Sequence, residues 1–217
     1  MSLCPAAPSR PFCHACKRPQ RNCICALAQT VVHRTEVLIL QHPQEVHEAK
    51  GTARLLHLCL AHSRLEVGEH FDAQQLQSWL AQGWQANAPA PRTVLLYPES
   101  APDPALPLVP APPLPPAWLQ DSQPLRLVVI DGTWRKSRKM LYLNPLLQQL
   151  PRLPLQALPA SRYAIRRAHR PGQLSTLEAA CCALQQLEPA NQALDGLLRA
   201  MHALVQRQLQ WQRRPPL

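Results

Sequence analysis

The stretch LRLVVIDGTWRKSRKML, which covers residues 125–141, decides the fold. It begins with aliphatic residues and carries no charge between Leu127 and Ile130, which predicts a strand buried on both faces. The run ends abruptly at Asp131, so we expect this acid at the carboxyl end of a central strand. In open α/β sheets that edge is where ligands bind, because loops and helix N-termini converge there. Asp131 is therefore the first candidate for a functional residue.

Four cations follow the acid within one predicted helix. Gly132 lets the backbone turn or approach a ligand closely, and the helix is expected to begin near Thr133. Its positive side chains are those of Arg135, Lys136, Arg138 and Lys139. An acid at the mouth of a basic crevice indicates chemistry on an anionic partner. A plainer alternative is that Asp131 merely caps the helix and that the cations form its solvated face.

The composition favours a folded protein that contacts a polyanion. The chain has 217 residues, 46% of them hydrophobic, which allows one α/β domain with a core and a small appendage. Lys and Arg outnumber Asp and Glu by 23 to 13, and the formal net charge of +10 makes nucleic acid the leading partner and a membrane surface the second. No apolar run approaches the roughly 20 residues needed to span a bilayer, and the first residues lack the features of a signal peptide. We therefore expect a soluble, cytoplasmic protein.

Two cysteine pairs near the N-terminus predict a structural zinc site. Close thiolate pairs separated by a short turn offer Zn²⁺ the four sulfurs that it accepts. The expected ligands are Cys13, Cys16, Cys23 and Cys25. We expect a closed zinc knuckle over residues 1–30 that holds the chain together and does not activate water. Unligated thiols, a redox pair, and replacement of one ligand by His14 or Cys4 are the alternatives. The cations of the knuckle that are expected to contact phosphates are Lys17, Arg18 and Arg21.

Residues 31–217 are expected to form the second, larger domain. Short aliphatic strands are predicted at Glu36–Gln41 and Thr93–Tyr97, with a helix after the cap residue Thr52. Ten of the 25 prolines fall between residues 98 and 124. Such a segment cannot pair into a sheet, so we expect an extended surface loop there.

Two further features lie near the C-terminus. A loop after residue 160 carries four arginines around one tyrosine, which predicts a phosphate-binding patch with an aromatic ring available for stacking. These residues are Arg162, Tyr163, Arg166, Arg167 and Arg170. The later segment Ser175-Thr176-Leu177-Glu178 has capping-box spacing, so the carboxylate of Glu178 can reach back to the amide of Ser175. A longer amphipathic helix over residues 190–212 is expected to pack on the sheet.

Six of these pieces, taken in order, resemble the DTW-domain family. Each piece alone is a weak signal, whereas the six in one order cover nearly the whole chain. The pieces are the four-cysteine knuckle, His42-Pro43 with Glu45, Leu96-Tyr97-Pro98, Asp131-Gly132-Thr133-Trp134, Tyr163-Ala164-Ile165-Arg166 and Leu174-Ser175-Thr176-Leu177-Glu178-Ala179. The proline-rich segment has no counterpart in the pattern of the family.

The resemblance implies a fold and a reaction. Family members are tRNA-uridine aminocarboxypropyltransferases and are similar to the SPOUT class of S-adenosylmethionine enzymes, which implies a parallel sheet with helices on both faces and a C-terminal trefoil knot. The implied reaction transfers the 3-amino-3-carboxypropyl group of S-adenosylmethionine to N3 of a tRNA uridine and leaves 5′-methylthioadenosine. The bacterial branch of the family suggests the variable loop of the tRNA, at position 47. No membrane and no obligate protein partner are implied, and the protein is expected to be a monomer or a homodimer.

The resemblance also implies roles for particular residues. A carboxylate within hydrogen-bond reach of uridine N3 can act as a general base, and Asp131 receives that role. Arg166 or the backbone amides near Ser175 and Thr176 are expected to grip the carboxylate of the co-substrate. The other expected co-substrate-binding residues line the adenosine pocket or lie beside it, and they are Leu96, Tyr97, Pro98, Ile130, Gly132, Thr133, Trp134, Leu174 and Glu178.

Two other classes of function stay open. A methyltransferase would use the same pocket and co-substrate but present the methyl group. A non-catalytic zinc-knuckle protein would bind RNA through its arginines alone, with Asp131 as a helix cap. A phosphate-handling enzyme is disfavoured, because the chain has 6 glycines and no glycine-rich phosphate loop.

Overall fold

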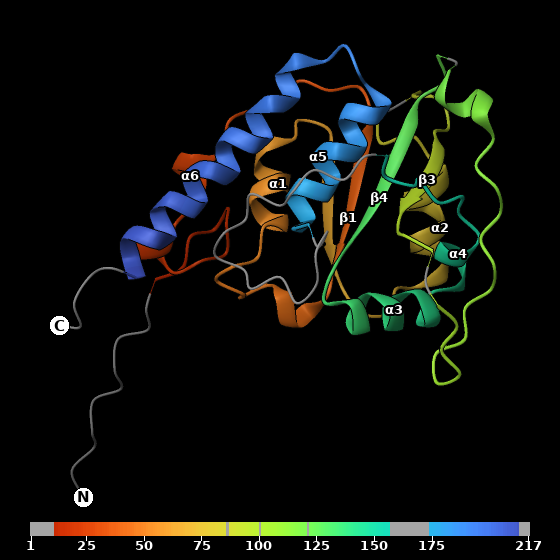
Figure 1. Cartoon of the computed structure of the whole chain (residues 1–217), viewed down its shortest axis with the longest axis horizontal. Helices are drawn as coiled ribbons and strands as arrows, with labels where there is room; N and C mark the ends of the chain where they lie inside the picture. Colours follow the sequence, from red (N-terminus) through yellow and green to blue (C-terminus); the bar gives the residue numbers. More distant parts are fainter. Residues whose placement is uncertain (1–10, 86, 100, 121, 157–173, 213–217) are drawn as a thin grey trace, which may run out of the picture.

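A four-stranded, wholly parallel sheet forms the centre of the protein (Figure 1). The computed structural model describes residues 11–212 except residues 86, 100, 121 and 157–173. The strands are β1 (Glu36–Gln41), β2 (Ser63–Val67), β3 (Arg92–Leu96) and β4 (Leu125–Asp131), and they lie in the order β2-β1-β4-β3. The two most apolar strands, β1 and β4, are thus the central ones, as expected for strands buried on both faces.

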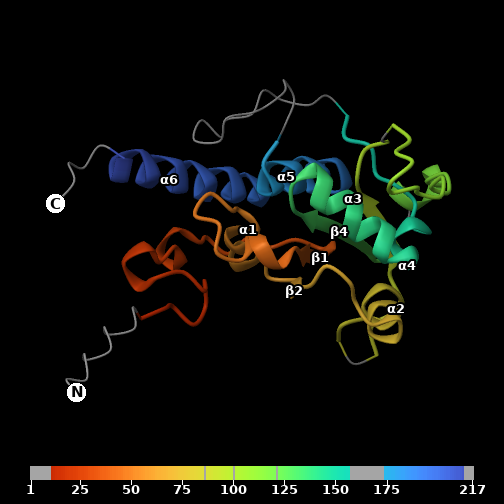
Figure 2. The ribbon, with the colours of Figure 1, turned by 90° about the horizontal axis from the view of Figure 1, so that it is seen from below.

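Helices cover both faces of this sheet, which confirms the predicted α/β class. They are α1 (Ala53–Cys59), α2 (Ala73–Ala81), α3 (Trp134–Leu143), α4 (Pro145–Gln148), α5 (Thr176–Leu187) and α6 (Asp195–Gln212). Figure 1 shows α1, α5 and α6 on one side of the sheet and α2 and α4 on the other. The long helix α6 runs past α1 toward the N-terminal knuckle (Figure 2).

Side chains of the central strands alternate between two cores. On the first face, Ile39 and Val129 pack with residues of α1, α5 and α6. On the second face, Leu40 and Val128 pack with residues of α2, α3 and α4. Side chains two residues apart share a face of a sheet, so Asp131 continues the row that contains Val129 and lies on the first face.

The structure adds one strand that the sequence did not predict. Strand β2 at the edge of the sheet reads Ser63-Arg64-Leu65-Glu66-Val67 and has no aliphatic run, because most of its side chains are half-buried. It pairs with β1 in a parallel register that sets Leu65 beside Ile39. Helix α6 also begins later than predicted, at Asp195, after a 3₁₀ turn over Gln192–Leu194.

Two predicted features involve segments without regular structure. The described residues of the proline-rich segment between β3 and β4 contain no strand and one 3₁₀ turn, over Pro116–Leu119. The predicted trefoil knot lies in the C-terminal part of the chain, where residues 157–173 are outside the described residues, so the knot stays a prediction. Among the helices described, none has the length and apolar character needed to cross a membrane.

Candidate active site at the carboxyl edge of the sheet

Asp131 is the last residue of β4, and it is buried with a relative exposure of 5%. In the sheet it pairs with Gln41, the last residue of β1. Nε2 of Gln41 donates a hydrogen bond to Oδ2 of Asp131 at 2.8 Å, and Oγ1 of Thr176 donates to Oδ1 at 2.6 Å. Because both carboxylate oxygens accept hydrogen bonds, the arrangement favours the ionised acid and fixes its orientation.

The N-cap of helix α3 is Thr133 and not Asp131, so the alternative interpretation of Asp131 as the helix cap is wrong. Oγ1 of Thr133 accepts a hydrogen bond from the amide of Lys136 at 3.4 Å. Gly132 lies close behind the acid, where an added Cβ would come within 3.2 Å of the Cβ of Lys136. The Asp131-Gly132-Thr133 segment therefore turns tightly and leaves the carboxylate to other partners.

The N-terminus of α5 approaches the same edge. Ser175 and Glu178 form the predicted capping box, with the amide of Ser175 donating to Oε2 of Glu178 at 2.8 Å and the amide of Glu178 donating to Oγ of Ser175 at 3.3 Å. The amide of Leu177 donates to Oγ1 of Thr52 at 3.1 Å. Of the amides expected to bind the co-substrate, that of Ser175 is thus already bonded, whereas that of Thr176 has no hydrogen bond to the described residues.

An aromatic pair borders the edge at the end of β3. The ring of Tyr97 is buried, whereas the indole of Trp134 is 54% exposed, and their centroids lie 6.0 Å apart at an interplanar angle of 74°. The guanidinium carbon of Arg152 lies 5.4 Å from the centre of the Tyr97 ring, and its NH1 donates to the carbonyl of Pro98 at 3.1 Å. The exposed indole of Trp134 is therefore available to stack on a flat ring.

The expected adenosine-lining residues lie on different faces of the sheet. Leu96 packs against the first core, on the same face as Asp131. Ile130 and Tyr97 pack with the second core. Leu174, directly before the cap of α5, is half-buried. A pocket that touches all of them has to extend over the edge of the sheet.

Three of the four cations that follow Asp131 are paired with acids. Nζ of Lys136 lies 2.7 Å from Oε1 of Glu45, and Nζ of Lys139 lies 2.9 Å from Oε2 of Glu69. Arg138 lies 3.6 Å from a carboxylate oxygen of Asp103 and donates to the carbonyl of Leu106. Arg135 is exposed and makes no hydrogen bond or ion pair with the residues that the structure describes. The crevice is therefore less basic than the sequence alone predicted.

A cavity of about 550 Å³ lies beside α3. Nδ1 of His42 accepts a hydrogen bond from the amide of Gln44 at 3.2 Å, so its Nε2 donates to Oε1 of Glu69 at 3.0 Å. Hydrogen bonds from Lys139 and His42 hold the pKa of Glu69 below its ordinary value. The residues that line the cavity are His42, Pro43, Gln44, Glu69, Arg135, Lys136 and Lys139.

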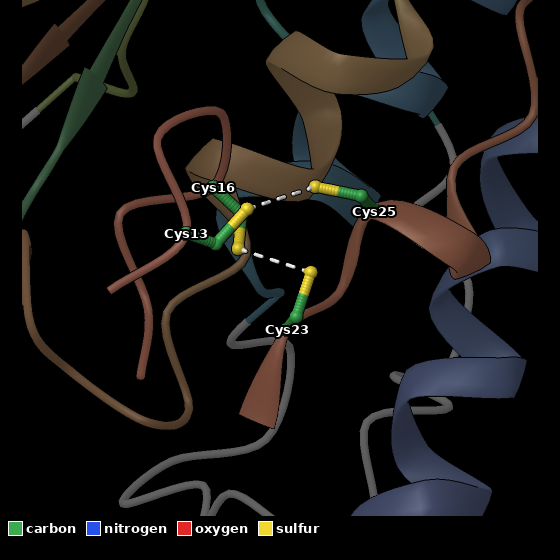
Figure 3. Close-up of side chains that lie close together, drawn as sticks. All are labelled: Cys13, Cys16, Cys23 and Cys25. Atoms are coloured by element: carbon green, nitrogen blue, oxygen red, sulfur yellow. Dashed lines mark hydrogen bonds between the residues drawn. The ribbon is translucent and has the colours of Figure 1, made fainter. Parts of the chain in front are cut away.

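The four cysteine sulfurs near the N-terminus converge within 4.8 Å of one another (Figure 3). The sulfurs of Cys13 and Cys25 are 3.6 Å apart, and those of Cys16 and Cys23 are 3.8 Å apart. Zn–S bonds of about 2.3 Å in a tetrahedron require S–S separations of about 3.8 Å, so the cluster has the dimensions of a zinc site. Hydrogen bonds from the amides of Cys16 and Ala15 lower the pKa of Cys13 to about 6, whereas burial raises the pKa of Cys25 to about 12, so the thiolate forms first at Cys13.

Basic side chains fasten the knuckle to the rest of the protein. Arg18 donates to the carbonyls of Ala49 and Gly51, at 3.0 and 2.7 Å, so this expected phosphate ligand is engaged at the start of α1. Arg207 of α6 donates to the carbonyls of Cys23 and Arg21. Lys17 and Arg21 are exposed, and Lys17 has a positive φ of 56° in the turn that closes the cluster.

The DTW domain family matches residues 10–209 of this chain. This protein belongs to the DTW-domain family. The DTW protein is 31% identical over 210 residues to "tRNA-uridine aminocarboxypropyltransferase 2" of Macaca fascicularis, which covers 94% of this chain and 65% of the relative. It is 32% identical over 201 residues to the protein of the same name in Drosophila melanogaster, which covers 91% of this chain and 74% of that relative.

The DTW protein is also 30% identical over 137 residues to "tRNA-uridine aminocarboxypropyltransferase A" of Arabidopsis thaliana, a match that covers 61% of this chain and 50% of the relative. The chain thus spans less than two thirds of the length of the macaque relative. No solved structure matches the chain.

The DTW fold brings together some predicted residues and adds others. Asp131 and Thr176 meet directly, through a hydrogen bond that the sequence did not predict. Gln41 and Glu69 were missed, although the polar Gln41 at the end of an aliphatic strand was a signal for an edge residue. The predicted phosphate-binding patch lies outside the described residues, and its members are Arg162, Tyr163, Arg166, Arg167 and Arg170.

Proposed function

We propose that this DTW-domain protein is a tRNA-uridine aminocarboxypropyltransferase that uses S-adenosylmethionine as its co-substrate. One observation carries the proposal: the carboxylate of Asp131, in the signature motif of the family, is buried at the carboxyl edge of the sheet with both oxygens held by hydrogen bonds. The names of the macaque and Drosophila relatives, at 31% and 32% identity, support it. A SPOUT-like arrangement, a structural zinc ion in the knuckle and a cytoplasmic location belong to the same proposal.

Asp131 acts as the general base. Uridine N3 carries a weakly acidic proton and is a poor nucleophile until a base removes it, and such a base contributes typically about 10²–10⁴-fold to the rate. Hydrogen bonds from Gln41 and Thr176 both go to carboxylate oxygens, so they favour the ionised form that can accept the N3 proton. The same bonds lower its basicity, so we expect proton transfer to accompany attack by N3.

The co-substrate supplies a sulfonium that is already an activated leaving group. A bond forms between N3 and the side-chain methylene next to sulfur, the bond from that carbon to sulfur breaks with its electron pair remaining on sulfur, and the N3 proton goes to Asp131. The products are the 3-amino-3-carboxypropyl uridine and neutral 5′-methylthioadenosine. The remaining task of the protein is alignment, which presents the methylene to N3 in place of the methyl group.

Described residues at the edge fit the parts of this co-substrate. The amide of Thr176 lies at the first turn of α5, a helix of 12 residues whose positive end favours a carboxylate, and we assign it to the carboxylate of the co-substrate with Arg166 as the second donor. The exposed indole of Trp134 and the side chain of Leu96 suit the flat adenine ring.

Exposed cations at two places suit the tRNA. Arg135 lies beside the signature motif, and Lys17 and Arg21 lie on the knuckle. Their side chains are free to neutralise phosphates, which is the main source of affinity for RNA backbones. Arg167 and Arg170 lie outside the described residues and are proposed to bind the same RNA, and a uridine of the variable loop is the proposed target.

The test is an incubation of the purified protein with unmodified tRNA transcripts and S-adenosylmethionine, followed by mass spectrometry of the nucleosides and of the spent co-substrate. We expect 5′-methylthioadenosine and an aminocarboxypropyl uridine. Asp131→Asn should lower turnover at least about 100-fold and keep tRNA affinity, because the side-chain amide keeps the shape of the carboxylate but cannot accept the N3 proton. Asp195→Asn, which changes an exposed acid at the start of α6, is the matched control and should be fully active.

Two other products would change the assignment. S-adenosylhomocysteine with a methylated base would mean that the site presents the methyl group and that the protein is a methyltransferase. The absence of both products across a full set of tRNAs, with the metal site loaded, would leave a zinc-knuckle protein that binds RNA without catalysis.

A further inference from the structure

The side-chain amide of Gln41 is satisfied at one end and unsatisfied at the other. Gln41 is 2% exposed, and its Nε2 donates to Oδ2 of Asp131 at 2.8 Å. Its Oε1 is also buried, and none of the described residues donates a hydrogen bond to it. A buried carbonyl without a donor is costly, because it has given up its bonds to water without replacement.

A second buried glutamine shows that the fold can satisfy both ends of such a side chain. Gln148 in α4 donates from Nε2 to the carbonyl of Leu141 at 2.8 Å, and its Oε1 accepts from the amide of Val109 at 2.8 Å. Gln148 is 7% exposed and lies on the second face, away from Asp131. Among the described residues the other buried side-chain atoms without a partner are two donors, Nε1 of Trp84 and Nε of Arg152, so the unsatisfied acceptor is the one beside the candidate base.

The neighbouring carboxylate fixes which end of the Gln41 amide is left without a partner. Turning the amide over would place Oε1 against Oδ2 of Asp131, and two acceptors would then repel each other. The bond from Thr176 to Oδ1 supports the ionised state of Asp131, so this repulsion persists. Oε1 of Gln41 is thus held as an acceptor that no described residue serves, which leaves a bound ligand or a water molecule as its donor.

We propose that Oε1 of Gln41 accepts a hydrogen bond from the ammonium group of the amino-acid part of S-adenosylmethionine. This assignment rests on the proposed function. An ammonium group carries three N–H donors and a positive charge, both of which suit a carbonyl oxygen beside an ionised carboxylate. The imide N–H of uridine suits it less, because two carbonyl oxygens flank that N–H and would face further acceptors.

The position of Gln41 relative to α5 supports the same ligand. Gln41 bonds to Oδ2 of Asp131, and Thr176 bonds to Oδ1. The residue with the unsatisfied acceptor and the residue with the first amide of α5 are therefore both in contact with the Asp131 carboxylate. An α-amino acid carries its ammonium and carboxylate groups on one carbon. Gln41 would hold the ammonium group while the amide of Thr176 holds the carboxylate, which places the transferred group beside Asp131.

Calorimetric titration with two ligands tests this assignment by binding alone. S-adenosylmethionine carries the ammonium group, whereas 5′-methylthioadenosine retains the adenosine and sulfur but lacks the whole amino-acid part. Gln41→Met keeps the length of the side chain and removes both the donor and the acceptor. We expect Gln41→Met to weaken the binding of S-adenosylmethionine at least about tenfold, since hydrogen bonds to charged groups are among the strongest. The affinity for 5′-methylthioadenosine should change by less than about twofold.

Two further variants separate a binding role from a general loss of structure. Gln148→Met removes a buried glutamine elsewhere and should leave the ratio of the two affinities unchanged. In Gln41→Glu the two neighbouring carboxyls should share one proton, which keeps a donor toward Asp131 and an acceptor at the unsatisfied position. The ratio of the two affinities should then stay near that of the unaltered protein, while turnover falls because Asp131 is no longer a free base.

The outcomes distinguish this assignment from the proposed function. Equal weakening of both ligands in Gln41→Met, or no weakening of either, would overturn the role of Gln41 and leave the transferase proposal standing. The role of Gln41 would also be overturned if the ratio of the affinities for S-adenosylmethionine and 5′-methylthioadenosine fell as far in Gln41→Glu as in Gln41→Met. Failure of the unaltered protein to bind S-adenosylmethionine at all would overturn the proposed function, and the assignment of Gln41 with it.

Discussion

The hydroxyl of Thr176 lies 2.6 Å from Oδ1 of Asp131, so the first residue of α5 bonds directly to the last residue of β4. The cap of α5 is the preceding residue, Ser175, which frees the Thr176 side chain from its own helix. The two signature segments, 45 positions apart in the chain, therefore meet through one hydrogen bond at the edge of the sheet.

This hydrogen bond predicts a graded pair of variants at Thr176. Thr176→Val keeps the shape of the side chain and removes the donor, so Asp131 loses one of the bonds that orient it, and we expect turnover to fall about tenfold. Thr176→Ser keeps the hydroxyl and should restore most of the rate. Initial rates at saturating tRNA and co-substrate provide the measurement, with thermal unfolding as a check on stability. Equal rates in the valine and serine variants would contradict the role of the hydroxyl.

The cysteine cluster predicts one zinc ion per chain. Metal analysis of the purified protein should find it, and Cys16→Ala should abolish it, because three sulfurs hold the ion more weakly than four. Cys16 and Ile24 belong to the core between α1 and α6, so loss of the metal should also lower the melting temperature by several degrees.

Cys59→Ala is the matched control for the metal site. Cys59 is a buried thiol of α1 outside the cluster, and its replacement should cost about 1–2 kcal/mol of stability from the cavity while the metal content stays unchanged. Retention of a full complement of zinc in Cys16→Ala would show that this thiolate is not a ligand.

Local patterns in the sequence predicted local structure well. The aliphatic run before Asp131, the start of a helix near Thr133 and the capping box at Ser175 each depend on neighbouring residues, and each is present in the structure. What the sequence could not give is the register between distant segments. Gln41 reaches Asp131 across 90 positions, and Lys139 reaches Glu69 across 70, so both contacts depend on the order of strands in the sheet.

The same limit explains why the basic crevice was overestimated. The sequence places four cations close after Asp131. It does not show that Glu45, between β1 and α1, pairs with Lys136, or that Glu69, after β2, pairs with Lys139. A central strand can be predicted from its composition, whereas the charge of a site depends on which loops the topology brings to it.

Arg135 and Lys139 should therefore differ in their contribution to tRNA binding. Arg135 is exposed and unpaired within the described residues, so Arg135→Ala should weaken the binding of tRNA several-fold. The salt dependence of the binding constant should fall by an amount that corresponds to about one released counterion. Lys139→Ala should weaken tRNA less, because Glu69 already neutralises this lysine. Filter binding across a series of salt concentrations gives both quantities.

Arg34→Ala is the control for a general loss of positive charge. Arg34 is exposed just before β1, at the opposite edge of the sheet from Asp131. An effect of Arg34→Ala as large as that of Arg135→Ala would show that tRNA responds to net charge and not to a surface beside the signature motif.

A buried histidine predicts how stability depends on pH. His33 is 3% exposed, its Nδ1 bonds to the carbonyl of Thr35 at 2.7 Å, and its Nε2 accepts from the amide of His62 at 3.1 Å. Both bonds are satisfied by the neutral ring, and burial lowers the pKa of His33 from 6.5. Below pH 6.5 the unfolded chain therefore binds a proton that the folded protein resists.

The sign of the effect follows from this difference. The contribution of His33 to stability is complete above pH 6.5 and is lost as the pH falls below that value, with a slope of at most about 1.4 kcal/mol per pH unit for one proton. His33→Asn keeps a donor and an acceptor but cannot be protonated, so its free energy of unfolding should vary less steeply between pH 5 and about 6.5. Burial also lowers the pKa of His57, which should leave part of the slope in both proteins. Urea unfolding at several pH values measures the difference, and parallel pH profiles would show that His33 is protonated as readily in the folded protein as in the unfolded chain.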